Sequence, residues 1–343
     1  MPALAVAAAL SAEGAEVHFI GGDRAEARLV PEAGFPFHPL SVVSLPRRAP
    51  LRALRAGAVD TAALARCLGL VRRIAPDVVM GGGGYVAGPV GLAGRLSGVP
   101  LVLTEIDSHL GLTNRLLAPL ASAVCLALPI PGRDGARYRV TGRPVPPVPD
   151  PAAGRLRGRA RFGIDPRERL IVIFGGSLGA RSINLAAVAA FAAPTLDGVG
   201  PVRVLHAAGE RDLPTLRAPG EHYDLRGYVP DFMDALLAAD LVIARSGGSI
   251  FEIARAGRAS VLVPYPHATA DHQTTNARFL ADAGAAAIVP DAEVSAERLR
   301  AEAAVLLGDP ARLAAMGAAA ETLARPAAAR DIAATVLAAA RRS

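Results

Sequence analysis

The chain has 343 residues, of which 52% are hydrophobic and 4% aromatic, with no Trp and a formal net charge of +6. Its length predicts about two domains, and its cores of small aliphatic residues favour layered α/β structure over an aromatic or disulfide scaffold. The two cysteines, Cys67 and Cys125, form neither a disulfide framework nor a zinc site. No apolar run reaches the roughly 18 residues that a membrane span needs, and we expect no signal peptide.

The predicted elements alternate between strand and helix along the chain. Residues 2–10 are expected to form a helix that is apolar on nearly all sides, and a turn at Gly14 leads to a strand over 16–20. Further short apolar runs predict strands at 78–80, 101–104, 170–174, 202–206, 241–244, 260–263 and 286–289. This order predicts mostly parallel sheets covered by helices on both faces. Residues 143–151 include five prolines and are the predicted interdomain linker.

Three of the strands lead into glycine-rich turns and then into helices. The turns read GGGGY from Gly81, GGSLG from Gly175 and RSGGS from Arg245. Glycine lets the backbone approach a ligand closely, and the N–H groups at a helix start attract phosphate or sugar oxygens. Tight packing explains any one of these turns, but three of them predict a shared ligand site.

A loop rich in hydrogen-bonding side chains follows the strand at 260–263. Gln273 and Asn276 lie three residues apart at a helix start, so they share a face and suit the hydroxyl groups of a sugar. The alternative is that Asp271 caps the helix and the rest of the loop is solvated.

Taken together, these segments resemble the MurG family of bacterial glycosyltransferases. The similar runs are GGGGYVAGP from Gly81, EIDSHLGLTN from Glu105, GGSLGARSIN from Gly175, RSGGSIFEIARAG from Arg245 and VPYPHATADHQTTNA from Val263. The resemblance extends over nearly the whole chain. It implies the GT-B fold, with two Rossmann-like domains whose mostly parallel sheets face a central cleft. It also implies inverting transfer of N-acetylglucosamine from UDP-GlcNAc to undecaprenyl-diphospho-muramoylpentapeptide (lipid I), which gives lipid II for peptidoglycan.

The same resemblance implies that separate domains bind the acceptor and the donor. Residues 1–145 become the acceptor and membrane-facing domain, residues 146–325 the UDP-GlcNAc domain, and residues 326–343 a C-terminal helix that packs back on the first domain. The protein is then expected peripherally at the cytoplasmic face of the cell membrane, with UDP-GlcNAc, lipid I and an anionic membrane surface as partners and no nucleic acid.

The site residues follow from the matching motifs. Glu252 is expected to accept hydrogen bonds from the ribose, and Gln273 with Thr274 to hold the GlcNAc ring. The full UDP-GlcNAc set is Asp107, Gly176, Ser177, Val229, Gly247, Gly248, Ser249, Ile250, Phe251, Glu252, Gln273 and Thr274. The expected acceptor site comprises Gly83, Gly84, Tyr85 and Asn114.

The implied mechanism is a single displacement in which an acceptor hydroxyl attacks the anomeric carbon while UDP leaves. We expect no metal or other cofactor, so helix starts at the glycine turns would stabilise the leaving diphosphate. Asp107, Glu105 and His109 are the candidate catalytic groups because they are the ionisable residues nearest the expected site.

Three departures from the family pattern are visible. The family has a strand and a GGTGGH-like loop before the segment that starts here at Pro2, so we expect this chain to be truncated or mis-started. The stretch from Ser246 to Glu252 is one residue shorter than usual, and Pro146 replaces an expected arginine.

Two alternatives to this function stay open, and one surface is ambiguous. The alternatives are an isomerase resembling UDP-GlcNAc 2-epimerase and a non-catalytic subunit that binds a UDP-sugar. The ambiguous surface is the segment 51–76, which suits an anionic membrane or an ordinary amphipathic helix on the sheet. It mixes apolar with basic residues, among them Leu64, Leu68, Val71, Arg66, Arg72 and Arg73.

Overall fold

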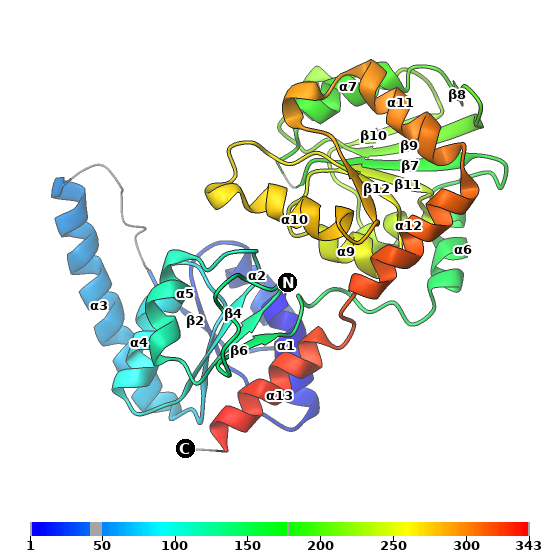
Figure 1. Ribbon diagram of the computed structural model, residues 1–343. Coiled ribbons are helices and arrows are strands. Elements are labelled where there is room, and N and C mark those ends of the chain that lie inside the picture. The colour runs from blue at the N-terminus through cyan, green and yellow to red at the C-terminus, as the bar shows by residue number, and fades with distance from the viewer. Residues whose placement is uncertain (1, 42–49, 177, 342–343) are drawn as a thin grey trace. The chain divides into compact units, whose positions relative to one another are not determined.

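The computed structural model describes residues 2–41, 50–176 and 178–341, with the backbone alone for 50–60 (Figure 1). The chain divides into two compact units. Unit 1 is Met1–Val145 with Arg325–Ser343, and unit 2 is Pro146–Ala324. The two units meet in sequence inside the proline-rich segment, where the rigid ring of each proline prevents a helix or a central strand from continuing.

Unit 2 is built on one parallel sheet. Its strands are β7 (Arg169–Phe174), β9 (Gly200–Ala207), β10 (Tyr223–Arg226), β11 (Leu241–Ala244), β12 (Ser260–Leu262) and β13 (Ala286–Ile288). They are arranged in the order β10-β9-β7-β11-β12-β13, and β8 (Thr195–Leu196) pairs antiparallel with β9. Two neighbouring strands, β7 and β11, are apolar runs buried on both faces, as a parallel sheet between helices requires.

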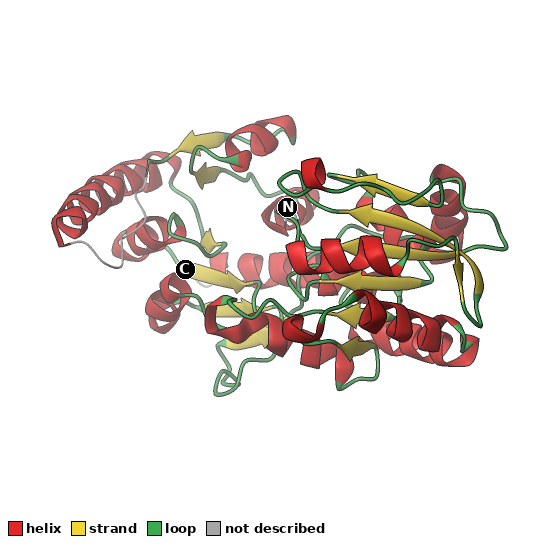
Figure 2. Ribbon diagram, turned by 90° about the horizontal axis from the view of Figure 1, so that it is seen from above, coloured by secondary structure: helices red, strands yellow, loops and turns green. Residues whose placement is uncertain are grey.

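Helices cover this sheet on its two faces (Figure 2). They are α6 (Pro151–Arg161), α7 (Arg181–Ala190), α8 (Phe232–Ala238), α9 (Ile250–Ala256), α10 (His272–Ala281), α11 (Ala296–Leu307) and α12 (Pro310–Leu323). Short 3-10 turns lie at η2 (Leu213–Thr215), η3 (Thr269–Asp271) and η4 (Asp291–Glu293). One core cluster joins Ile171 and Ile243 of the sheet to Ile183 of α7 and Leu299 of α11, all fully buried.

Unit 1 contains two separate parallel sheets. β1 (Phe19–Gly21) pairs with β2 (Phe37–Pro39), and β3 (Val79–Gly81), β4 (Leu101–Glu105), β5 (Ala123–Leu126) and β6 (Tyr138–Val140) form the other in that order. Within the described ranges, no strand pairs with both β1 and β3. The helices are α1 (Pro2–Ala12), α2 (Ala25–Glu32), α3 (Pro50–Ile74), α4 (Ala87–Leu96), α5 (Leu112–Leu117), η1 (Ala118–Leu120) and α13 (Ala328–Ala340).

The first and last helices of the chain pack together in unit 1. Val6 and Leu10 of α1 share a core cluster with Ile332 and Val336 of α13 (blue and red in Figure 1). This contact buries apolar side chains of α1, a helix whose sequence is apolar on nearly all sides and so needs more than one packing partner.

The apolar stripe of α3 is also used inside unit 1. Val71 is buried, and Leu64 and Leu68 pack against the same cluster, which includes Ala93 of α4. The arginines between them, Arg66, Arg72 and Arg73, are exposed. No helix in the described part of the chain is both long and apolar enough to traverse a bilayer.

The predicted α/β fold with mostly parallel sheets is confirmed, and each predicted strand overlaps an observed one. The strands that the apolar runs did not reveal are β2, β5, β6, β8 and β10. β6 and β10 are short, alternate with charged residues and lie at sheet edges, so they lack a continuous apolar signal.

Candidate active site

Unit 2 places two glycine-rich turns side by side at the centre of its sheet. β7 and β11 are hydrogen-bonded neighbours, with Ala244 opposite Phe174 at their carboxyl ends, and one turn follows each strand. The chain runs outward from β7 through β9 to β10 and then returns to β11 on the other side of β7. In open parallel sheets, ligands bind beyond the carboxyl ends of the strands at such a reversal. The two turns therefore occupy the position at which a ligand is expected to bind.

The turn after β7 requires glycine for steric reasons. Gly176 and Gly179 have φ of 88° and 78°, a region that side chains with a Cβ disfavour. A Cβ on Gly175 would overlap the backbone of Ala180, and one on Gly179 would overlap the carbonyl oxygen of Ala208. The turn is therefore locked against the end of β9 by its own backbone.

A buried polar network supports this turn from below. Asn184 of α7 donates from Nδ2 to the Ala208 carbonyl (2.9 Å) and to Asp212 (3.0 Å), and its Oδ1 lies 3.0 Å from His206 Nε2. His206 Nδ1 is 2.8 Å from the Tyr223 hydroxyl, and burial lowers the pKa of His206 to about 4. The imidazole is therefore neutral at pH 7 and acts as a structural link. Asn184 is not among the site residues predicted from the sequence, although it closes the GGSLGARSIN run that begins at Gly175.

The turn after β11 is tied to the start of α10. Ser246 donates from Oγ to the Gln273 carbonyl (2.7 Å), and Asn276 donates from Nδ2 to the Ser246 carbonyl (2.9 Å). The Gln273 Oε1 accepts from the Tyr265 N–H at 3.0 Å. Because the oxygen of this amide is engaged, its NH₂ group is the half that lies near Gly247, 4.0 Å from where a Cβ would stand. Gln273 therefore presents hydrogen-bond donors towards the turn.

The loop before α10 has an unusual backbone. Ala270 and Asp271 have φ of 53° and 51°, which is uncommon for residues with side chains. Thr274 donates from Oγ1 to Asp271 Oδ1 at 2.6 Å, so its hydroxyl can still accept a hydrogen bond from a ligand. Backbone strain of this kind clusters at functional loops.

The remaining predicted donor-site residues of unit 2 differ in exposure. Gly247, Gly248, Ser249 and Glu252 are half-buried and Ser177 lies outside the described residues. The side chains of Val229, Ile250 and Phe251 are buried at 2%, 0% and 7% exposure. These three residues therefore belong to the core of unit 2.

Unit 1 contains a buried carboxylate at the end of β4. Glu105 ends β4 at 6% exposure, and its side chain accepts from the N–H groups of Asp107 (3.2 Å) and Gly111 (2.9 Å) and from Asn114 Nδ2 (2.9 Å). Asn114 also donates to the Thr104 carbonyl at 3.0 Å, and its Oδ1 is buried without a hydrogen-bond partner among the described residues. Three donors on one carboxylate suit an anchor for the loop 106–111 better than a proton acceptor.

The other candidates of unit 1 lie around this anchor. Gly83 and Gly84 have φ of 80° and 73°, and a Cβ on Gly83 would be 3.7 Å from Asn114 Nδ2. Tyr85 is 36% exposed, and the Arg24 guanidinium lies over its ring at 5.7 Å. Asp107 and His109 are half-buried in the loop that Glu105 holds.

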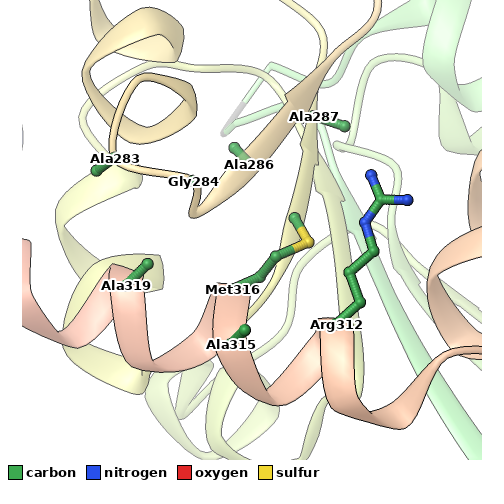
Figure 3. A pocket seen from close by; sticks show the side chains of 8 residues that line it. All are labelled: Ala283, Gly284, Ala286, Ala287, Arg312, Ala315, Met316 and Ala319. Carbon is green, nitrogen blue, oxygen red and sulfur yellow. The ribbon is translucent and has the colours of Figure 1, made fainter.

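A cavity of about 450 Å³ in unit 2 lies elsewhere, and none of the predicted site residues lines it (Figure 3). It is bounded by the α10–β13 connection and α12, and Figure 3 shows small side chains with Met316 and Arg312 around it. Over the residues that the structure describes, no group of three or more His, Cys, Asp or Glu side chains is arranged to hold a metal ion.

Comparison with known proteins identifies both units. Residues 1–126 match the glycosyltransferase family 28 N-terminal domain, and residues 170–335 match the glycosyltransferase family 28 C-terminal domain. Among curated relatives, the UDP-N-acetylglucosamine–N-acetylmuramyl-(pentapeptide) pyrophosphoryl-undecaprenol N-acetylglucosamine transferase of Moorella thermoacetica is 41% identical, over 98% of this chain and 94% of its own length. The protein of the same name from Rubrobacter xylanophilus is 37% identical over 98% and 99%.

Solved structures agree with these matches. The Acinetobacter baumannii MurG crystal structure is 30% identical with a TM-score of 0.77, covering 98% of this chain and 95% of that one. A putative UDP-N-acetylglucosamine 2-epimerase from Listeria monocytogenes reaches a TM-score of 0.72 at 15% identity, covering 100% and 94%, which shows a shared fold alone. The chain therefore belongs to the MurG family of UDP-N-acetylglucosamine transferases, within glycosyltransferase family 28 and with the GT-B fold.

Proposed function

We propose that this chain transfers N-acetylglucosamine from UDP-GlcNAc to lipid I and so forms lipid II for peptidoglycan. The observation that carries the proposal is the pair of glycine turns at the reversal of the unit 2 sheet, with the Gln273 amide donors beside them. Membership of the MurG family connects that geometry to this reaction.

Unit 2 binds the nucleotide sugar in this proposal. Backbone N–H groups of Gly176 and of Gly247 to Ser249 face the diphosphate, because glycine leaves the backbone open to close approach. Glu252 accepts from the ribose hydroxyls, and Gln273 donates to the sugar. Val229, Ile250 and Phe251 are buried and support these contacts from the core of unit 2.

Unit 1 binds the acceptor and takes up its proton. The acceptor hydroxyl oxygen forms a bond to the anomeric carbon as the bond to the UDP oxygen breaks, and the hydroxyl proton passes to a side chain of the loop 106–111. Asp107 and His109 are the groups that we assign to this transfer. Glu105 positions that loop through its three hydrogen bonds. Gly83, Gly84 and Tyr85 line the acceptor side, and the buried Asn114 supports them from within unit 1.

We assign a peripheral position at the cytoplasmic face of the membrane to unit 1. The exposed arginines of α3 support this assignment, because each basic residue near an anionic surface contributes about 1 kcal/mol. The apolar residues between them belong to the core of unit 1, so the attraction is chiefly electrostatic.

The test is a product assay with radiolabelled UDP-GlcNAc and lipid I. Radiolabel in the lipid fraction is the expected result, free N-acetylmannosamine would indicate an epimerase, and binding without turnover a non-catalytic subunit. Gln273→Ala and Glu252→Ala should each lower kcat/KM by about 10- to 100-fold, the loss expected for one hydrogen bond to bound substrate. Glu302→Gln on α11 serves as the control, and wild-type kinetics in both site variants would remove these residues from the site.

A further inference from the structure

Arg245 is a buried cation that joins several loops at the carboxyl ends of the unit 2 strands. It follows β11, and its side chain is 10% exposed. Its guanidinium donates to the carbonyl groups of Val263 and Pro264, both at 3.2 Å, and to Ser182 Oγ at 2.9 Å. It also lies over the Tyr265 ring, 5.4 Å from the centroid. The segment after β12 is therefore held from the end of β11.

Asp291 supplies the negative charge for this cation. It opens η4 just after β13, and its Oδ1 lies 2.6 Å from Arg245 Nη1. The same oxygen accepts from Ser182 Oγ at 2.7 Å, so the serine bridges the ion pair at the start of α7. A buried guanidinium is costly without a paired anion, and a charge-assisted hydrogen bond fixes its direction. Asp291 is therefore the anion that pairs with Arg245, and together with Ser182 it helps to fix the direction of this side chain.

The direction of the Arg245 side chain matters because Tyr265, which it contacts, is hydrogen-bonded to Gln273. The Tyr265 N–H donates to Gln273 Oε1 at 3.0 Å, and that bond turns the NH₂ group of Gln273 towards Gly247. Arg245 holds Tyr265 through its ring and through the two carbonyl groups just before it. A chain of contacts thus runs from Asp291 through Arg245 and Tyr265 to the Gln273 amide.

We propose that Asp291 is a positioning residue for the donor sugar, acting through Arg245 and Tyr265 to orient the Gln273 amide. This proposal rests on the function proposed above, in which Gln273 contacts the sugar and not the UDP moiety. It predicts that loss of Asp291 weakens UDP-GlcNAc binding more than UDP binding. A merely structural role would weaken both ligands alike.

The experiment measures the dissociation constants of UDP-GlcNAc and of UDP by calorimetry. The set comprises the wild type, Asp291→Asn, Asp291→Ala, Gln273→Ala and the double variant Asp291→Asn with Gln273→Ala. We expect Asp291→Asn to reduce the preference for UDP-GlcNAc over UDP by about threefold and Asp291→Ala by about tenfold. In transfer assays both changes should raise the KM for UDP-GlcNAc and leave kcat nearly unchanged.

The double variant tests whether Asp291 acts on ligand binding through Gln273. If Asp291 acts through Gln273, Asp291→Asn has no further effect on the ligand preference once Gln273 is alanine. Glu293→Gln is the matched control, because it removes a carboxylate of the same turn that pairs with Arg298 instead. Should Asp291→Ala lose all UDP binding, the isosteric Asp291→Asn decides the question.

Two results overturn the inference, and a third separates it from the proposed function. An unchanged preference in Asp291→Asn, or an effect that adds fully to Gln273→Ala, would show that Asp291 does not act on the sugar contact. A wild-type protein that transfers no sugar to lipid I would contradict the proposed function itself.

Discussion

Units 1 and 2 both place glycine turns at the ends of parallel strands, but they hold those turns by different means. In unit 2 the turn after β7 is locked by backbone contact, since Gly179 leaves no room for a Cβ against Ala208. In unit 1 the corresponding region rests on the buried Glu105 carboxylate and its bond to Asn114. A site held by backbone packing should tolerate substitutions that change charge but not those that add volume. A site held by a carboxylate should instead be sensitive to substitutions that remove its charge, even when they preserve its volume. The predictions below test that contrast.

The largest effect is expected for Gly179→Ala. The new methyl group would overlap the Ala208 carbonyl in addition to requiring a positive φ, so we expect unit 2 to lose about 3 kcal/mol or more of unfolding free energy, together with UDP binding. Gly176→Ala is the matched control, because its φ is 88° but none of the described residues outside its chain neighbours lies within 4 Å of its Cβ position. It should cost about 1–2 kcal/mol. Equal losses in urea unfolding would show that backbone contact does not lock the turn.

The buried network beneath that turn predicts a pH dependence for unit 2. His206 has a pKa of about 4 in the folded protein against an ordinary value of 6.5, so between these values the unfolded chain binds more protons. The stabilisation from the neutral imidazole is complete above pH 6.5 and is lost as the pH falls towards 4, by about 3 kcal/mol at most.

Urea unfolding at several pH values measures this slope, and His206→Gln should flatten it. The variant comparison is needed because unit 1 contains His38, whose pKa is also lowered, by burial and by electrostatic interactions with His18 and Arg73. An unchanged slope in His206→Gln would place the pH dependence elsewhere.

A change at Glu105 should destabilise unit 1 and leave unit 2 unaffected, the opposite of the effect expected for Gly179→Ala. Glu105→Gln keeps the shape but turns an NH₂ group towards at least one N–H donor, which should cost unit 1 about 1–3 kcal/mol of stability. We expect lipid I turnover to fall while UDP binding in unit 2 stays unchanged. Asp107→Asn should instead reduce kcat with little loss of stability. A Glu105→Gln protein that melts like the wild type but has no activity would make Glu105 the base.

The smallest effect is expected at the surface of unit 1. Arg72→Ala with Arg73→Ala should leave the melting temperature unchanged and weaken flotation with anionic vesicles by about 2 kcal/mol in total. Arg28→Ala on α2, whose guanidinium is paired with Glu32, is the control. Flotation that depends neither on anionic lipid nor on the two arginines would exclude this membrane contact.

The amino-acid sequence by itself determined the α/β class, the alternation of strand and helix and the family. Apolar runs such as residues 170–174 and 241–244 are long enough to specify buried parallel strands, and the glycine turns follow them directly. These signals depend only on residues close together in the sequence, so they can be recognised without the structure. The edge strands β6 and β10 escaped it because their charged residues interrupt the apolar pattern.

What only the tertiary structure decided is which groups meet and in what state. Asp291 and Ser182 are 109 residues apart, and nothing in the sequence around them indicates that they share a hydrogen bond beside Arg245. Likewise Glu105 has the chemistry of a base in the sequence, and only folding brings three donors to its carboxylate. Residue type sets what a side chain can do, whereas its burial and its partners, which arise from contacts distant in sequence, set what it does.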